Sequence, residues 1–171
     1  MVADVLSERW GLSRPKERYR GRIAEGRADA GGLPGGDPQA DGPRARVAVL
    51  WPQTYMNDVG RSVGPARGAL KVSLDRVLVI HDEIDIPFGD VRARLGGGLA
   101  GHNGLKSLKR ELGDPGFVRV RVGVGRPSSS DPEIVSSYVL GRFREDPAQV
   151  RDLIERAADT VQRIVLGKES V

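Results

Sequence analysis

Strand-like runs alternate with helix-like segments along this chain of 171 residues, and this alternation restricts the fold more than any other feature. Residues 77–80 form a continuous apolar run of the kind that parallel sheets bury, whereas residues 117–124 carry valine at every second position. Residues 103–112 instead repeat leucine at helical spacing before Gly113. Strands interleaved with helices predict a layered α/β fold. We expect one domain over residues 1–171, with three layers in which helices flank a twisted mixed, largely parallel sheet.

The remaining segments complete this pattern. Residues 1–11 and 57–70 predict helices, and a further helix should begin where Asp146 suits the N-cap position and Pro147 the first turn. Residues 26–46 are rich in glycine, proline and aspartate, which predicts a flexible loop. The other expected strands are residues 19–25 and 45–51, forming a hairpin that carries this loop, and residues 90–95.

Composition excludes several kinds of chemistry. The absence of cysteine rules out disulfides, iron–sulfur clusters and thiol nucleophiles, and two histidines leave little for a histidine-based metal site. No stretch approaches the roughly 18 apolar residues of a membrane span, and Asp4 and Glu8 lie where a secretory signal would be basic. The net charge of +4 permits an anionic partner. We therefore expect a cytoplasmic protein without membrane contact.

Polar residues follow the apolar run directly, beginning with His81, Asp82 and Glu83. Open α/β sheets place their sites at the carboxyl ends of strands, although a solvated turn would have a similar composition. If the strand continues into this segment, His81 and Asp82 point to opposite faces. A catalytic pair between these two neighbours is therefore not expected.

Three consecutive glycines at residues 96–98 stand between a predicted strand and a predicted helix, where backbone N–H groups would favour an anion. With Gly101 they match the dinucleotide-binding spacing, but the acidic ribose ligand about twenty residues further on is missing. A Walker A loop is excluded because His102 and Asn103 stand where lysine and serine or threonine are required. A dinucleotide-binding oxidoreductase and a plain turn stay open as alternatives.

Residues 51–57 join a predicted strand to a predicted helix, and Asn57 is placed to be the N-cap of that helix. Basic residues gather around the glycine segment, and strand alternation puts Arg92 with Arg94, and Arg119 with Arg121, on matching faces. Together they resemble a surface that follows phosphates. The full set is Arg92, Arg94, Lys106, Lys109, Arg110, Arg119, Arg121 and Arg126.

Taken together, these clusters resemble bacterial peptidyl-tRNA hydrolase, a monomeric α/β esterase that frees tRNA from prematurely released peptides. The motifs keep their order and compatible spacing over nearly the whole chain except residues 26–46. The matching segments are Pro-Gln-Thr-Tyr-Met-Asn at 52–57, His-Asp-Glu-Ile-Asp-Ile-Pro at 81–87, Leu-Gly-Gly-Gly-Leu-Ala-Gly-His-Asn-Gly-Leu at 95–105, Phe-Val-Arg-Val-Arg-Val-Gly-Val-Gly-Arg-Pro at 117–127 and Tyr-Val-Leu-Gly at 138–141.

The resemblance implies hydrolysis of the ester between a peptide and the 3′ ribose of tRNA, without a metal or organic cofactor. Asp82 matches the carboxylate that supports the general base, and Asn57 and Asn103 match asparagines that position water and substrate. The expected partner is peptidyl-tRNA, bound by a monomer in the cytoplasm. The residues that match tRNA-binding positions are Tyr55, Asn57, Asn103, Arg94 and Arg121.

The resemblance also implies a departure at the N-terminus. Family members open with a core strand, an Asn-Pro-Gly loop and a Thr-Arg-His-Asn segment whose histidine is the general base, and the next helix corresponds to residues 1–11. We therefore expect a truncated chain without that strand or that histidine, since His81 and His102 match other positions. Either a start codon lies upstream, or the chain is genuinely short and aggregation-prone through unpaired strand edges. A non-catalytic tRNA-binding module is then the alternative to a hydrolase.

Overall fold

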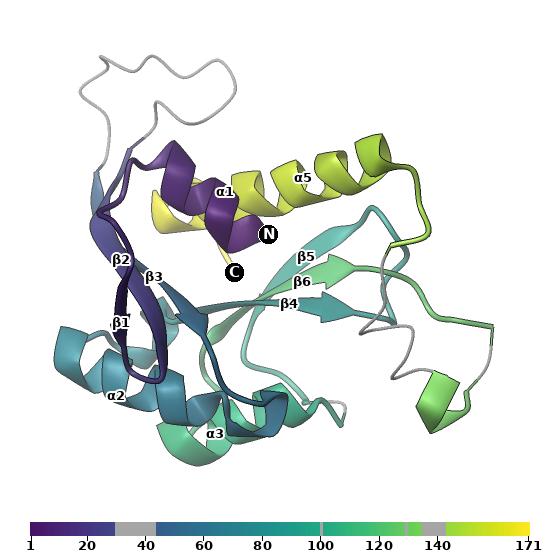
Figure 1. Ribbon diagram of the computed structural model, residues 1–171, viewed down its shortest axis with the longest axis horizontal. Coiled ribbons are helices and arrows are strands. Elements are labelled where there is room, and N and C mark those ends of the chain that lie inside the picture. The colour runs from purple at the N-terminus through teal and green to yellow at the C-terminus, as the bar shows by residue number, and fades with distance from the viewer. Residues whose placement is uncertain (30–43, 100, 129, 135–142) are drawn as a thin grey trace.

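The computed structural model describes residues 1–29, 44–99, 101–128, 130–134 and 143–171, and Figure 1 shows the path of the chain. Most of the predicted loop and the motif at residues 138–141 lie outside the described residues. The elements in chain order are α1 (Val2–Arg9), β1 (Lys16–Arg18), β2 (Gly21–Ala28), β3 (Ala45–Pro52), η2 (Met56–Asp58), α2 (Gly60–Leu70), η3 (Leu74–Arg76), β4 (Leu78–Glu83), β5 (Val91–Leu95), α3 (Asn103–Leu112), β6 (Val118–Gly123) and α5 (Pro147–Val165).

The predicted hairpin is confirmed and forms most of the first sheet. β2 pairs antiparallel with β3 along its whole length, from Gly21 opposite Pro52 to Ala28 opposite Ala45. The short strand β1 pairs with the start of β2. Tyr19 and Arg20, expected within a strand, instead form the turn between β1 and β2 with φ of 56° and 52°. This sheet has the order β1-β2-β3.

The second sheet has the order β4-β6-β5, with β4 parallel and β5 antiparallel to the central strand β6. The sheet is mixed, as expected, but the expectation of a largely parallel arrangement is wrong. Among the described strands, β4 and β6 form the one parallel pair. Residues 84–90 connect β4 to β5 and are too few for the crossover that two parallel strands need, so β5 runs antiparallel to β4. The connection from β4 to β6 is longer and includes α3, so these two strands can be parallel.

Helices cover both faces of the second sheet, which gives the expected three layers (Figure 1). On one face, Val120 of β6 packs in a core with Leu6 of α1 and Ala158 of α5. On the other face, Leu105 and Leu108 of α3 pack against Phe117 and the partly buried Val77 and Val79. The alternating valines of β6 therefore face α5, and its two arginines face α3. The predicted absence of a further core strand stays a prediction.

Two helix boundaries follow from local chemistry as predicted. The Asp146 side chain accepts a hydrogen bond from the Ala148 N–H at 2.8 Å, and Pro147 occupies the first turn of α5. Gly113 ends α3 with φ of 81°, a conformation that glycine adopts without the cost of a Cβ. Both helices present strong apolar faces to the sheet, so they serve as the outer layers.

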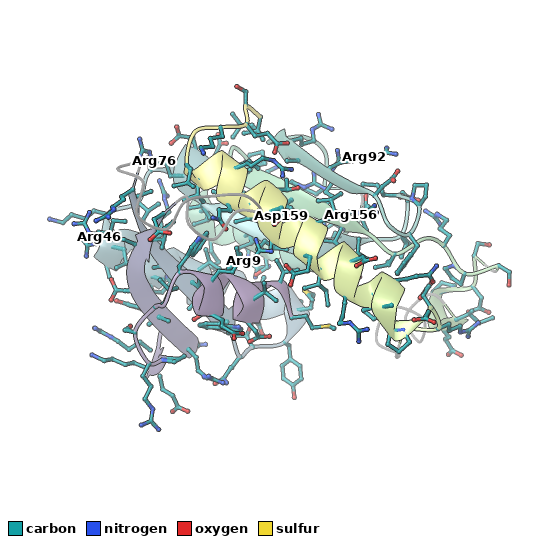
Figure 2. The ribbon with its side chains drawn as sticks, turned by 90° about the horizontal axis from the view of Figure 1, so that it is seen from above. Arg9, Arg46, Arg76, Arg92, Arg156 and Asp159 are labelled. Atoms are coloured by element: carbon teal, nitrogen blue, oxygen red, sulfur yellow. The ribbon has the colours of Figure 1, made fainter. Side chains whose placement is uncertain are left out.

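A partly buried cation, Arg9, joins the first helix to the last. Arg9 of α1 donates to Asp159 of α5 at 2.7 Å and also pairs with Glu155, and its side chain is 15% exposed. Figure 2 shows Arg9 and Asp159 meeting between the two helices. Because α1 is short, it depends on contacts with the rest of the protein. The apolar contacts of Leu6 and Trp10 hold it against the core, and the ion pair fixes its orientation relative to α5.

We predict that Arg9→Ala lowers the free energy of unfolding by about 2 kcal/mol, because it leaves the partly buried Asp159 carboxylate without its partner. Urea unfolding followed by circular dichroism measures this change. The matched control is Arg46→Ala, since Arg46 is 78% exposed and lies 3.7 Å from Glu25; it should change stability by no more than about 0.5 kcal/mol. Equal effects from the two substitutions would contradict a special role for Arg9.

Candidate active site

The N-terminus of α3 brings together segments that are far apart in the sequence. His102 caps this helix, because its Nδ1 accepts a hydrogen bond from the Leu105 N–H at 3.2 Å. Its ring meets the ring of His81, at the end of β4, edge to face with centroids 5.1 Å apart. The carboxyl end of β4 and the start of α3 are therefore neighbours, as expected for a site at a strand end.

The segment that carries Tyr55 and Asn57 rests on the same helix. A Cβ added at Gly104 would lie 2.6 Å from the sulfur of Met56, so the close approach of η2 to α3 depends on this glycine. Arg110 of α3 also donates to the backbone oxygen of Asn57 at 3.2 Å. Tyr55 is 83% exposed, and the side chains of Asn57 and Asn103 are exposed as well. These polar groups are therefore available to a ligand.

Asn57 does not have the structural role that its position suggested. It lies inside η2, and the N-cap of α2 is Val59, which provides no side-chain hydrogen bond. The free N–H of Gly60 instead donates to Oγ of Ser107 on α3, at 2.9 Å. The prediction of Asn57 as a helix cap is thus wrong. Its amide is not needed to begin the helix, which favours a functional reading.

Asp82 lies on the other face of β4 from His81, as predicted. β4 extends to Glu83, Asp82 stands opposite Val122 in the register, and alternation turns its side chain toward the α5 layer. Among the described residues, no hydrogen bond joins its carboxylate to Asn57 or Asn103. The carboxylate of Asp82 therefore faces the α5 layer, whereas Asn57 in η2 and Asn103 in α3 lie on the other face of the sheet.

Both imidazoles use their lone pairs inside the protein. The carbonyl oxygen of Asp82 can only accept, so the 2.9 Å contact from His81 Nδ1 requires a proton on that nitrogen. His81 Nε2 then accepts from Arg119 Nε at 3.4 Å. Burial is the main cause that lowers the pKa of His81 to about 4, so the ring is neutral at pH 7. The one lone pair of a neutral His102 faces the Leu105 N–H, so this arrangement gives neither ring a free proton acceptor.

Three arginines gather on the α3 side of the sheet. The strand register sets Arg94 opposite Arg119, and Arg121 opposite His81. Burial is the main cause that lowers the pKa of Arg119; the charges of Arg121 and Arg94 lower it further, and the charge of Glu83 raises it. The buried Nε of Arg121 has no hydrogen-bond partner among the described residues. Three guanidiniums against one opposing carboxylate leave an excess of positive charge, which favours a phosphate ligand.

The predicted basic surface has to be corrected at Arg119. Its face is as predicted, but it is only 3% exposed and does not belong to the surface. One guanidinium nitrogen donates to the backbone oxygen of Gly98 at 2.5 Å, within the glycine segment. Nearby, a Cβ added at Gly97 would lie 2.5 Å from Cζ of Arg94, so that arginine lies directly on the segment. Alternation along residues 117–124 indicated the face of Arg119 but not its burial.

The described residues contain no group of three or more acidic, histidine or cysteine side chains placed to hold a metal ion. None of the described helices is long and apolar enough to cross a membrane.

Taken together, the three-layer α/β fold places exposed amides beside a capped helix and a cluster of arginines, an arrangement that suits an anionic ligand. Comparison with known proteins gives the family: a family model described as peptidyl-tRNA hydrolase matches residues 1–171, and the chain belongs to that family.

Relatives and solved structures agree with this assignment. A peptidyl-tRNA hydrolase from Rhodopseudomonas palustris (strain TIE-1) is 37% identical over 171 residues, covering 99% of this chain and 75% of the relative. The protein of the same name from Geotalea daltonii is 41% identical, covering 96% of this chain and 78% of the relative. The crystal structure of a mutant peptidyl-tRNA hydrolase from Acinetobacter baumannii superposes with a TM-score of 0.77 at 30% identity, covering 98% of this chain and 78% of that one.

These matches decide between the alternatives that the sequence left open. They support a hydrolase, and they favour neither a non-catalytic tRNA-binding module nor a dinucleotide-binding oxidoreductase. The family match runs from residue 1 to residue 171, and it does not support the expectation of an N-terminal truncation that removes the catalytic histidine.

We predict that His81 makes the protein less stable as the pH falls from 6.5 toward 4. Between the ordinary pKa of 6.5 and the folded value of about 4, the unfolded chain binds a proton that the folded chain excludes, so acid favours unfolding. The contribution has a slope of about 1.4 kcal/mol per pH unit. Urea unfolding across this pH range should show a shallower dependence for His81→Asn than for the parent. Identical slopes would mean that His81 is not held neutral.

Proposed function

We propose that the chain hydrolyses the ester bond between the peptide and the 3′ ribose of peptidyl-tRNA, releasing free tRNA for reuse in translation. The observation that carries the proposal is the convergence of the Tyr55–Asn57 segment and the end of β4 on the start of α3, beside the arginine cluster. Membership of the peptidyl-tRNA hydrolase family supports the same reaction. We place the protein in the cytoplasm as a monomer, and the reaction requires no cofactor.

Asp82 is the carboxylate in this reaction. Its position at the end of β4, outside any described side-chain hydrogen bond, suits the carboxylate that orients and stabilises the general base. Asn57 and Asn103 bind the peptide–ribose end of the substrate, and their amide N–H groups donate to the oxyanion that forms on the ester carbon. Tyr55 offers an exposed ring beside them for contact with the substrate.

Arg94 and Arg121 hold a phosphate group of the tRNA. A phosphate between them would relieve the repulsion among the guanidiniums and would give the buried Nε of Arg121 an acceptor. Phosphate binding is thereby assigned to Arg94 and Arg121, and chemistry to Asp82, Asn57 and Asn103. The two roles can be separated by substitution.

We predict that Asp82→Asn lowers kcat for peptidyl-tRNA by about 10²- to 10⁴-fold and leaves the Kd for tRNA nearly unchanged. Single-turnover hydrolysis and filter binding measure the two quantities. Asp85→Asn is the matched control, because Asp85 belongs to the same segment but pairs at the surface with Arg126 at 2.5 Å. Unchanged turnover in Asp82→Asn would remove its assigned role. An unmodified protein that binds tRNA without turnover would contradict the hydrolase itself.

We predict that Arg121→Ala weakens tRNA binding and reduces the slope of log K against log salt concentration by about one, as expected for one lost phosphate contact. Binding isotherms at four or more salt concentrations measure that slope. Arg156→Ala removes the same charge from α5 on the other side of the sheet (Figure 2) and should leave the slope unchanged. Equal slope changes in both variants would indicate a general charge effect and contradict the phosphate contact.

A further inference from the structure

Arg119 is a buried cation that the proposed chemistry does not use. Burying a charge is costly unless partners replace its water, and Arg119 is only 3% exposed. Its partners in the described structure are neutral: Nε donates to His81 Nε2 at 3.4 Å, and a terminal nitrogen donates to the Gly98 oxygen at 2.5 Å. No carboxylate within salt-bridge distance is found among the described residues. If this position were merely structural, an apolar residue would cost less free energy to bury there than an arginine.

The two acceptors belong to the two segments that form the site. His81 stands near the end of β4, and its own Nδ1–H donates to the carbonyl oxygen of Asp82. Gly98 belongs to the glycine segment that leads toward α3 and Asn103. One guanidinium therefore connects to the backbone of Asp82 through two successive hydrogen bonds by way of His81, and to the glycine segment before Asn103 through one hydrogen bond.

The glycine segment needs such an external contact. Gly96 and Gly97 adopt φ of 66° and 97°, values that glycine reaches freely but that leave the backbone with little stiffness of its own. Arg94 lies on one side of this segment, and Arg119 binds its carbonyl oxygen. The planar fork of arginine can donate in both required directions at once, whereas a lysine ammonium is a single compact charge on a flexible stem.

We propose that Arg119 is a positioning residue for hydrolysis: its guanidinium fixes His81 and the glycine segment, and so sets Asp82 and Asn103 at the distance that the reaction needs. This inference rests on the proposed function. Because Arg119 is buried, it acts through these residues and does not touch the substrate. It is therefore distinct from Arg121 and Arg94, which are assigned to the phosphate.

The test compares Arg119→Met and Arg119→Lys with the control Arg46→Met, whose arginine lies on β3 of the other sheet, is 78% exposed and pairs with Glu25. We expect Arg119→Met to lower kcat by roughly 10- to 100-fold, as a misplacement of about 1 Å does, with KM changed by no more than about threefold. Arg119→Lys should recover part of kcat, and Arg46→Met should match the parent. Arg121→Ala should show the opposite split, with a raised KM.

A second readout does not depend on activity. The chain has only two histidines, so ¹⁵N spectra of the imidazoles are simple to assign. In the parent, His81 should appear as the neutral Nδ1–H tautomer with Nε2 accepting from Arg119, and Arg119→Met should shift the Nε2 resonance. Slow exchange of the Arg119 Nε proton in the parent tests the same contact without any variant.

The possible outcomes separate the two proposals. A lowered kcat with a native melting curve and a shifted His81 resonance supports the positioning role. Unchanged kcat in Arg119→Met, a loss fully explained by a lower folded fraction, or an unaltered His81 resonance would overturn it. If the parent does not hydrolyse peptidyl-tRNA, the proposed function fails, while the spectra and proton exchange still decide whether Arg119 holds His81.

Discussion

The alternation of side chains along β6 is the constraint on which the site depends. β6 is the central strand of its sheet, so its pairing with β4 and β5 fixes the positions of both. Its valines Val118 and Val120 are almost fully buried, and Val120 packs with residues of α1 and α5. A slip of one residue would bring Arg119 and Arg121 into that apolar layer. Hydrophobic burial on one face therefore fixes where the cations stand on the other.

On the α3 face, Arg119 lies close enough to Arg94 and Arg121 for their positive charges to act on it. Arg94 and Arg121 both act on Arg119, and Glu83 is the acidic group that opposes them. An anion between the exposed Arg94 and the half-buried Arg121 would change this repulsion into attraction. The same charges would therefore add to the affinity for such an anion, and this gain should decrease as the salt concentration increases.

Features set by local chemistry were predictable from the sequence, and features set by distant contacts were not. The cap of α5 at Asp146, the hairpin of β2 and β3 and the opposite faces of His81 and Asp82 follow from short-range patterns. The antiparallel placement of β5 at the far edge of β6 depends on the order of strands, which no local pattern contains.

Two errors at the site have the same origin. Asn57 is not a cap because Ser107, 47 residues after Gly60, already satisfies the Gly60 N–H. Arg119 is buried because the glycine segment and His81 enclose it, and both contacts join residues that are far apart along the chain.

In the proposed function, β4 connects the Asp82 carboxylate with the arginines that are assigned to phosphate. Asp82 and His81 point to opposite layers, so the carboxylate does not share the electrostatic surroundings of the arginines. Yet the His81 ring donates to the carbonyl oxygen of Asp82, and the same ring accepts from Arg119. A shift of the guanidinium would therefore move the Asp82 backbone through two hydrogen bonds. Because His81 is neutral, this connection transmits position and carries no charge of its own.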